Sequence, residues 1–169
     1  ITPLQMLRVI AGVSVGGRMT TPHCFLKSSA GYDRTGIWQE EMQYIDEGQF
    51  NVPMSMEVQE TIKQAMWGVV NENGTGGRAR VEGLDVAGKT GTAQVASKHR
   101  AGEKYKDHAW FVSFAPRDKP EIASVVLCEN CGFGGVHAAP KAKCLYEAWA
   151  SRRLNASLST PDSLKVPQP

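Results

Sequence analysis

The segment "GLDVAGKTGTAQV", residues 83–95, holds the residue types whose spacing could do chemistry. Its first eight residues fit G-x-x-x-x-G-K-T, the loop that cradles phosphates in nucleotide hydrolases. Lys89, Thr90 and Gly91 also spell K-T-G, which is typical of a substrate-binding strand in serine enzymes that transfer acyl groups. The first interpretation requires a helix directly after Thr90, whereas the second requires an extended strand.

The flanking residues favour the strand. "RARVE" before Gly83 is too polar for the buried strand that precedes a phosphate loop. "GTAQVAS" after Thr90 places a glycine and a β-branched residue where a helix would make its first turn. "IASVVLCE" could still serve as an apolar strand ending in a magnesium-binding acid. A P-loop nucleotide-binding protein therefore remains an alternative.

In a strand, Lys89 and Gly91 point to one face while Thr90 and Thr92 point to the other. An edge strand can pair its backbone with an extended peptide, and Gly91 would let that peptide lie close. Lys89 supplies positive charge near a carboxylate or a nucleophile, and a threonine hydroxyl can add a hydrogen bond to the carboxylate. Three letters alone fit a surface lysine in an ordinary hairpin equally well.

Two helices are predicted before this segment. The first runs from about Pro3 to Val15, with Thr2 as its N-cap and Gly16-Gly17 after its end. Residues 18–54 show no sustained period and are predicted to form loops with short strands. The second helix lies in "SMEVQETIKQAMWGVVNENG", between a cap at Ser55 and a stop at Gly74. Its predicted core face contains Val58, Ile62, Ala65 and Val69.

Three strands and a helix are predicted after it. The strand segments are "DVAGKTGTAQV", "HAWFVSFAP" and "EIASVVLCEN", and the short turn "RDKP" joins the last two into an antiparallel hairpin. "ASKHRAGEKYKD" is predicted to be a solvated loop. The last helix spans about Ala138 to Arg153, with Ala138, Ala142, Leu145 and Trp149 on one face. This order predicts an α+β fold, an antiparallel sheet packed against helices, over residues 1–153, with a disordered tail at 154–169.

Composition sets limits on partners. The chain has 169 residues, 41% of them hydrophobic and 21% charged, as in an ordinary globular protein. A formal charge of +2 is too small to indicate nucleic acid or an anionic membrane as the main partner. No apolar run is long enough to span a bilayer. Because the chain opens without Met at a helix start, we expect a domain cut at an element boundary.

The four cysteines are Cys24, Cys128, Cys131 and Cys144. Cys128 and Cys131, with His137 and Cys144 beyond, could in principle ligate zinc, but a second closely spaced pair is missing. We therefore expect packed or free thiols, with no metal and no cofactor.

Six ordered segments carry a family resemblance: "ITPLQM", "GTGGRA", "VAGKTGTAQV", "DHAWFVSFAP", "LCEN" with the glycines of "CGFGG", and "HAAPKAK". Together they resemble the C-terminal part of the transpeptidase domain in class B penicillin-binding proteins, nearest to the elongation-type members known as penicillin-binding protein 2. The resemblance covers roughly residues 1–152. It implies the fold shared by penicillin-binding transpeptidases and serine β-lactamases.

The activity implied by this resemblance is a peptidoglycan DD-transpeptidase, a covalent target of β-lactams. A serine attacks the D-Ala-D-Ala end of a stem peptide and passes the acyl group to a neighbouring amine. Lys89 would carry the electrostatic role, Thr90 and Thr92 would bind the substrate carboxylate, and Gly91 would give clearance. The backbone N–H of Thr92 would complete the oxyanion hole.

The resemblance also implies a setting, a periplasmic domain of a bacterial inner-membrane protein with a membrane glycosyltransferase of the elongation machinery as partner. One departure from the family pattern matters. The family requires S-x-x-K for the nucleophile and S-x-N for proton relay, and neither pattern occurs in these 169 residues. We therefore expect a fragment that is inactive alone. A non-catalytic peptide-binding module is the alternative.

Overall fold

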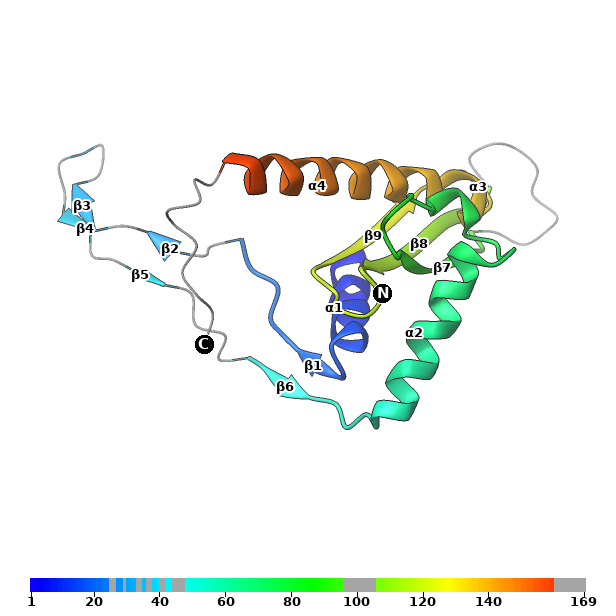
Figure 1. Cartoon of the computed structure of the whole chain (residues 1–169), viewed down its shortest axis with the longest axis horizontal. Coiled ribbons are helices and arrows are strands. Elements are labelled where there is room, and N and C mark those ends of the chain that lie inside the picture. Colours follow the sequence, from blue (N-terminus) through cyan, green and yellow to red (C-terminus); the bar gives the residue numbers. More distant parts are fainter. Residues whose placement is uncertain are drawn as a thin grey trace.

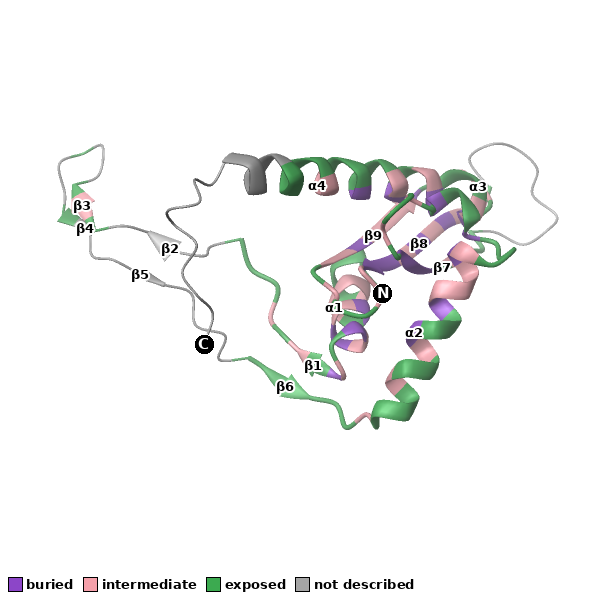
Figure 2. Cartoon of the chain, in the orientation of Figure 1, coloured by how far each residue is buried: buried purple, intermediate pink, exposed green. Residues whose placement is uncertain are grey.

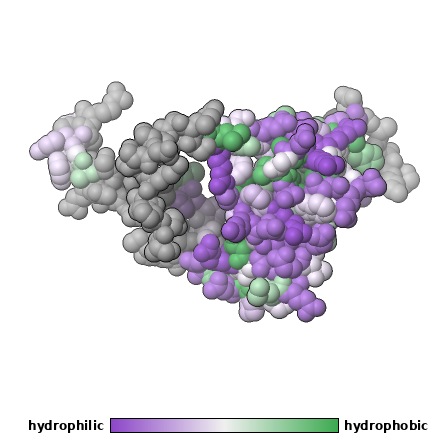
Figure 3. Space-filling model, in the orientation of Figure 1, coloured by the Kyte–Doolittle hydropathy of each residue, from purple (hydrophilic) through white to green (hydrophobic). Residues whose placement is uncertain are grey.

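The computed structural model describes residues 1–24, 27–28, 30–32, 35, 38–39, 42–43, 48–95 and 106–159. Figure 1 shows a short sheet with one helix along one side and two helices on the other. Hydrophilic residues dominate the face seen in Figure 3, and hydrophobic ones lie there in small separate patches. Within the described ranges, no helix is both long and apolar enough to cross a membrane.

Helix α1, Pro3–Ser14, begins as predicted and ends one residue before the predicted Val15. The Thr2 hydroxyl accepts from the Gln5 amide at 3.2 Å, and the Gln5 side chain accepts from the Thr2 amide at 2.8 Å. This reciprocal pair satisfies two N–H groups that a bare helix end would leave without partners. Gly16 and Gly17 then take φ values of +76° and +92°, which turn the chain away from the helix axis.

The next segment pairs only in short pieces, as predicted for the part of 18–54 that is described. Strand β1 pairs with β6, β2 with β5, and β3 with β4, all antiparallel. The bounds are Arg18–Met19 for β1, Lys27–Ser28 for β2, Gly31–Tyr32 for β3, Trp38–Gln39 for β4, Met42–Gln43 for β5 and Phe50–Asn51 for β6.

Helix α2, Met56–Asn71, is capped by Ser55 as predicted, but the predicted core face is partly wrong. Met66 and Val70 are buried, whereas Val58 and Ala65 are exposed. The helix packs on the sheet through a neighbouring stripe, rotated from the predicted one, that also contains half-buried Trp67. The predicted stop at Gly74 is late by three residues, since Gly74 lies in the turn that follows.

The central sheet has the order β7-β8-β9, with both pairs antiparallel. Its strands are Ala87–Ala93 for β7, His108–Ala115 for β8 and Ile122–Cys128 for β9, close to the predicted segments, and "RDKP" forms the predicted turn. Strand β7 is therefore an edge strand among the described strands. Lys89 and Thr90 lie in the middle of β7, so the helix that a phosphate loop requires does not follow them and that alternative is wrong.

Helices cover both faces of this sheet, which confirms the α+β class (Figure 2). Phe114 of β8 packs with Ile10 of α1 and Met66 of α2 on one face. Phe111 of β8 packs with Val70 and with Tyr146 of α4, Ala139–Ser159, on the other. Two short helices, η1 (Gly77–Ala79) and α3 (Gly134–His137), lie on the α4 side.

Two details of the last helix differ from prediction. Leu145 is 49% exposed, and Tyr146 takes the buried position between Ala142 and Trp149 instead. The predicted end at Arg153 is wrong, because α4 runs to Ser159, six residues into the predicted tail. The rest of that tail, 160–169, lies outside the described residues, as does most of the predicted loop, 96–105.

Candidate functional site

Lys89 is exposed on the face of β7 that α1 and α2 cover. Its ammonium donates a hydrogen bond to the carbonyl oxygen of Thr90 at 2.8 Å. Beside it lies a pocket of about 350 Å³, which Thr90 and Thr92 also line, together with apolar residues that include Ile1, Met6 and Trp110. Lys89 therefore places a positive charge on the edge strand, beside a pocket whose lining is largely apolar.

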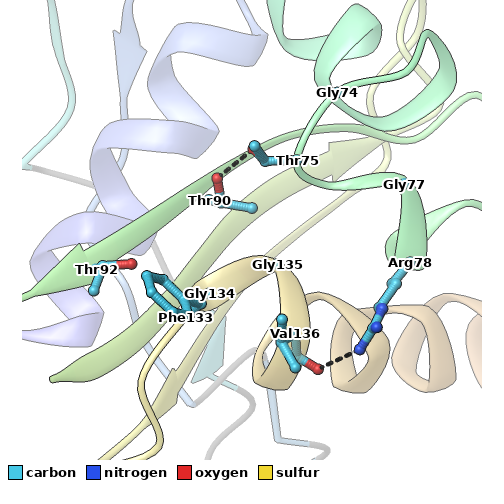
Figure 4. Close-up of a pocket in the computed structure, with 10 residues that line it drawn as sticks. All are labelled: Gly74, Thr75, Gly77, Arg78, Thr90, Thr92, Phe133, Gly134, Gly135 and Val136. Carbon is cyan, nitrogen blue, oxygen red and sulfur yellow. Dashed lines mark hydrogen bonds between the residues drawn. The ribbon is translucent and has the colours of Figure 1, made fainter. Parts of the chain in front are cut away.

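Thr90 and Thr92 occupy the opposite face, as the alternation predicted. Thr90 lies opposite Phe111 and Thr92 opposite Ala109, whose side chains point to the α4 side. Both threonines line a larger pocket of about 520 Å³, shown in Figure 4. The Thr90 hydroxyl shares a hydrogen bond of 2.7 Å with the Thr75 hydroxyl, which fixes the Thr90 rotamer.

Glycines allow the other walls of this pocket to come so close to β7. A Cβ on Gly134 would lie 2.3 Å from the Trp110 carbonyl oxygen and 2.5 Å from that of Gly91. A Cβ on Gly135 would lie 2.2 Å from the Thr75 carbonyl oxygen. Because real Cβ atoms do not approach so closely, only glycine lets α3 pack against both the strand and the loop at 74–77.

Gly91 itself has a packing reason to be glycine. A Cβ there would lie 3.2 Å from the Cβ of Trp110, the residue opposite it in the register. The predicted role of Gly91, to leave space for a substrate backbone, stays a prediction in addition to this packing reason.

The charge in the larger pocket comes from Arg78. Its guanidinium donates to the Val136 carbonyl oxygen at 3.4 Å, while Phe133, 71% exposed, lies near Thr92 in Figure 4. Among the described residues, the lining consists of three threonine hydroxyls, one guanidinium, small residues and two apolar side chains, without a carboxylate: Gly74, Thr75, Gly77, Arg78, Thr90, Thr92, Phe133, Gly134, Gly135 and Val136. Such a pocket suits an anionic ligand.

The sequence-based prediction of site residues missed Thr75, Arg78, Phe133 and Val136. Their signal was the glycine pairs in "GTGGRA" and "CGFGG", of which Gly134 and Gly135 mark backbone that must approach other backbone. That signal indicates where chain segments meet, and it does not say which strand they meet.

The cysteines do not gather. The Cys128 thiol is buried and donates to the His137 carbonyl oxygen at 3.6 Å, while Cys24 and Cys144 are exposed. The described part of the chain has no group of three or more His, Cys, Asp or Glu residues placed to hold a metal ion. Behind the sheet, burial raises the pKa of the Tyr146 phenol, although the hydrogen bonds that it forms with Ser113 and Ser124 act in the opposite direction.

Comparison with known proteins adds a sequence match and structural matches. Residues 1–147 match the model of the penicillin-binding protein transpeptidase domain. The chain is 35% identical over 164 residues to peptidoglycan D,D-transpeptidase MrdA of Haemophilus influenzae, and 34% identical over 160 residues to that of Acinetobacter baumannii. Each alignment covers 90% of this chain but only 24% and 23% of those relatives, so the chain spans about a quarter of their length.

Solved structures agree with the fold. The D,D-transpeptidase domain of a peptidoglycan glycosyltransferase from Eggerthella lenta superposes with a TM-score of 0.69 at 27% identity, over 90% of this chain and 33% of that one. Pseudomonas aeruginosa PBP2, solved in complex with WCK 5153, gives a TM-score of 0.62 at 26% identity, over 88% of this chain and 29% of that one. The chain thus belongs to the penicillin-binding protein transpeptidase domain family.

Proposed function

We propose that this chain forms one wall of the active site of a peptidoglycan D,D-transpeptidase that β-lactams acylate. The observation that carries the proposal is the family match over residues 1–147 together with a K-T-G sequence in the middle of an edge strand. An extended stem peptide would pair with the free edge of β7, as in other cases of strand addition.

The residues on the two faces of β7 have different roles in this proposal. Thr90 and Thr92 bind the terminal carboxylate of the donor peptide, or the corresponding carboxylate of a β-lactam, through their hydroxyls. Lys89, on the other face, stabilises negative charge near the nucleophile. The Thr92 amide forms half of the oxyanion hole, and the Gly91 backbone stays accessible because it carries no side chain.

The attacking serine and its lysine are not among these residues, because neither S-x-x-K nor S-x-N occurs in them. The chain alone is therefore expected not to react with penicillin. By family, the protein works in the bacterial periplasm, anchored at the inner membrane beside a glycosyltransferase of the elongation machinery, and needs no cofactor.

Fluorescent penicillin, read on a denaturing gel, tests this function. It is applied to this chain, to the full-length protein and to full-length variants. We expect label on the full-length protein only. Thr92→Val should slow acylation about tenfold, the cost of one hydrogen bond to a charged group, and Lys89→Ala about a hundredfold.

Matched substitutions control for general damage. Lys119→Ala removes a lysine from the exposed β8–β9 turn, and Thr61→Val removes a hydroxyl from the exposed side of α2. Both should acylate at the normal rate. Absence of label on the full-length protein would favour the non-catalytic peptide-binding module instead.

A further inference from the structure

Two of the four cysteines lie on either side of one turn at the end of β9. The strand ends at Cys128, Glu129 and Asn130 form the turn, and Cys131 follows it. Asn130 has a φ of +52°, the left-handed backbone that lets the chain reverse within so few residues. Such a turn places the Cα atoms on either side of it within about 7 Å, and a disulfide joins Cα atoms about 4.4–6.8 Å apart. The spacing therefore permits a bond between the two sulfurs.

Both thiols lie on the α4 side of the sheet. Cys128 is 7% exposed and belongs to the hydrophobic cluster that contains Phe111, and the half-buried Cys131 packs against the same cluster. Cys24 and Cys144 are exposed and belong to neither core cluster. Because Cys131 is more accessible than Cys128, an oxidant from solution meets Cys131 first.

Hydrogen bonds to the start of β8 hold this turn in place. The Asn130 amide donates to Nδ1 of His108 at 2.9 Å, and the Gly132 amide donates to the Asp107 carbonyl oxygen at 2.7 Å. These bonds are made by backbone amides, so they do not depend on the state of the thiols. The turn is therefore preorganised, and little chain entropy is lost when its two ends are joined.

We propose that Cys128 and Cys131 form a redox-sensitive disulfide that fastens the loop after β9. The oxidant is a small disulfide such as oxidised glutathione. The Cys131 thiolate attacks one sulfur of the oxidant and releases the other as a thiolate. The Cys128 thiolate then attacks the Cys131 sulfur and releases the second thiolate. One S–S bond forms in the protein, one breaks in the oxidant, and the two released thiolates take up the two protons that the cysteines lose.

The bond acts on a segment that lines the larger pocket. Phe133 and Gly134 line that pocket and follow directly after Gly132 and Cys131. In the reduced form the Cys128 thiol, a weak donor, forms one hydrogen bond of 3.6 Å to the carbonyl oxygen at the end of α3. A covalent bond in its place restricts the chain that leads into α3, so local opening of this helix becomes rarer.

Mass spectrometry of the full-length protein tests whether the bond forms. The protein is equilibrated with glutathione that is mostly oxidised, its remaining thiols are blocked with N-ethylmaleimide, and it is digested with trypsin without reduction. One peptide, residues 118–141, contains Cys128 and Cys131 but neither Cys24 nor Cys144, because trypsin does not cleave before Pro120. We expect this peptide without maleimide and two hydrogens lighter than its dithiol form.

Reduction and substitution assign the bond. Treatment with dithiothreitol before blocking should place a maleimide on each cysteine of the peptide. Cys131→Ser should abolish the lighter peptide, whereas the matched control Cys144→Ser, at an exposed thiol of α4, should keep it. Two maleimide groups on the peptide after oxidation, or glutathione that stays on Cys131, would show that the proposal is wrong.

Hydrogen exchange then tests the fastening. The amides of Val136, His137 and Ala138 donate within α3 and should exchange about tenfold more slowly in the oxidised full-length protein than in the reduced one. Cys131→Ser should show no such difference, and α1, on the other face of the sheet, should exchange alike in both forms. Equal exchange of α3 in the two forms would overturn the fastening.

This proposal goes beyond the proposed function, although an oxidising periplasm would favour the disulfide. The two can fail separately. If benzylpenicillin does not acylate the full-length protein but the lighter peptide forms, the transpeptidase is wrong and the disulfide stands. If acylation occurs while the peptide keeps both thiols, the disulfide is wrong and the transpeptidase stands.

Discussion

Lys89 and Thr90 are sequence neighbours on opposite faces of β7, and both line the smaller pocket. The pleat of β7 sends the lysine toward α1 and the threonine toward α3, so one tripeptide supplies a cation to one face and a hydroxyl to the other. The hydrogen bond from the Lys89 ammonium to the Thr90 carbonyl ties the two together within the strand. Lys89 does not line the larger pocket, where Arg78 supplies the positive charge beside Thr90 and Thr92.

Three buried hydroxyl groups behind the sheet form a closed ring of hydrogen bonds, in which each hydroxyl donates one hydrogen bond and accepts one. Tyr146 donates to Ser113 at 2.9 Å, Ser124 donates to Tyr146 at 3.2 Å, and the Ser113 and Ser124 oxygens are 2.9 Å apart. Because the single hydroxyl hydrogen of Ser124 is donated to Tyr146, the hydrogen bond between the two serines is donated by Ser113. All three buried hydroxyls are thereby satisfied, which joins α4 to β8 and β9.

Removal of the Tyr146 hydroxyl should lower the free energy of unfolding and change its pH dependence. Tyr146→Phe should cost about 1–2 kcal/mol at neutral pH, the value of a buried hydrogen-bonded hydroxyl. Because burial raises the pKa of Tyr146 above its ordinary 10.0, its contribution is complete below that pH. It is lost as pH rises above it, since the unfolded chain ionises first.

Urea unfolding at pH 8 and above pH 10 measures this effect. The unsubstituted protein should lose more stability than Tyr146→Phe across that interval. Tyr32→Phe, at a residue that is 75% exposed, should behave like the unsubstituted protein. An equal alkaline loss in Tyr146→Phe would show that the buried phenol is not its cause.

At the scale of elements, the pocket depends on glycine contacts between α3 and the sheet. Gly134→Ala would force a methyl group against the carbonyl oxygens of Trp110 and Gly91, so α3 must move away from β7. We expect a loss of about 2–3 kcal/mol in unfolding free energy, as for other overpacked sites, and weaker penicillin acylation of the full-length protein.

Gly77→Ala is the control in the same pocket. A Cβ there meets only the Val70 carbonyl oxygen at 3.9 Å, an ordinary contact. Urea unfolding and penicillin acylation should change little in this variant. Similar losses in Gly134→Ala and Gly77→Ala would mean that close packing of α3 does not shape the pocket.

The sequence predicted the elements far better than the faces of the helices. Capping at Thr2 and Ser55, and β-rich runs around a short turn, depend on local chemistry, and the structure contains them. The buried stripe of α2 depends on how that helix crosses the sheet, so Met66 is buried and Ala65 is exposed. The end of α4 lacked a signal, because "NASLS" has no glycine or proline to stop a helix.

The candidate site was predictable along β7 and not across it. K-T-G and strand alternation predicted a strand with Lys89 and Gly91 on one face and Thr90 and Thr92 on the other, which the structure contains, because both signals lie within one strand. The chemical roles of these residues stay a prediction. Arg78 comes from a different part of the chain and meets β7 only through tertiary packing. Hydrophobic periodicity in a single sequence does not indicate which distant segments of the chain pack against each other.

At the scale of the whole molecule, one strand holds both cores. Alternate residues of β8 face α1 and α2 on one side and α4 on the other, so Phe114 and Phe111 belong to different clusters. Because β8 contributes side chains to both hydrophobic clusters, its unfolding would disrupt both of them. The layers on both faces are therefore expected to unfold together.

Phe114→Leu and Phe111→Leu test this coupling, because both side chains are fully buried. Each should lower the unfolding free energy by on the order of 1–2 kcal/mol through lost apolar area and a small cavity. Hydrogen exchange of backbone amides should show equal losses in α1 and α4 for either variant, although each substitution touches only one face. Phe133→Leu, at the exposed pocket residue, should leave both helices unchanged, whereas a loss confined to α1 in Phe114→Leu would mean that the faces open independently.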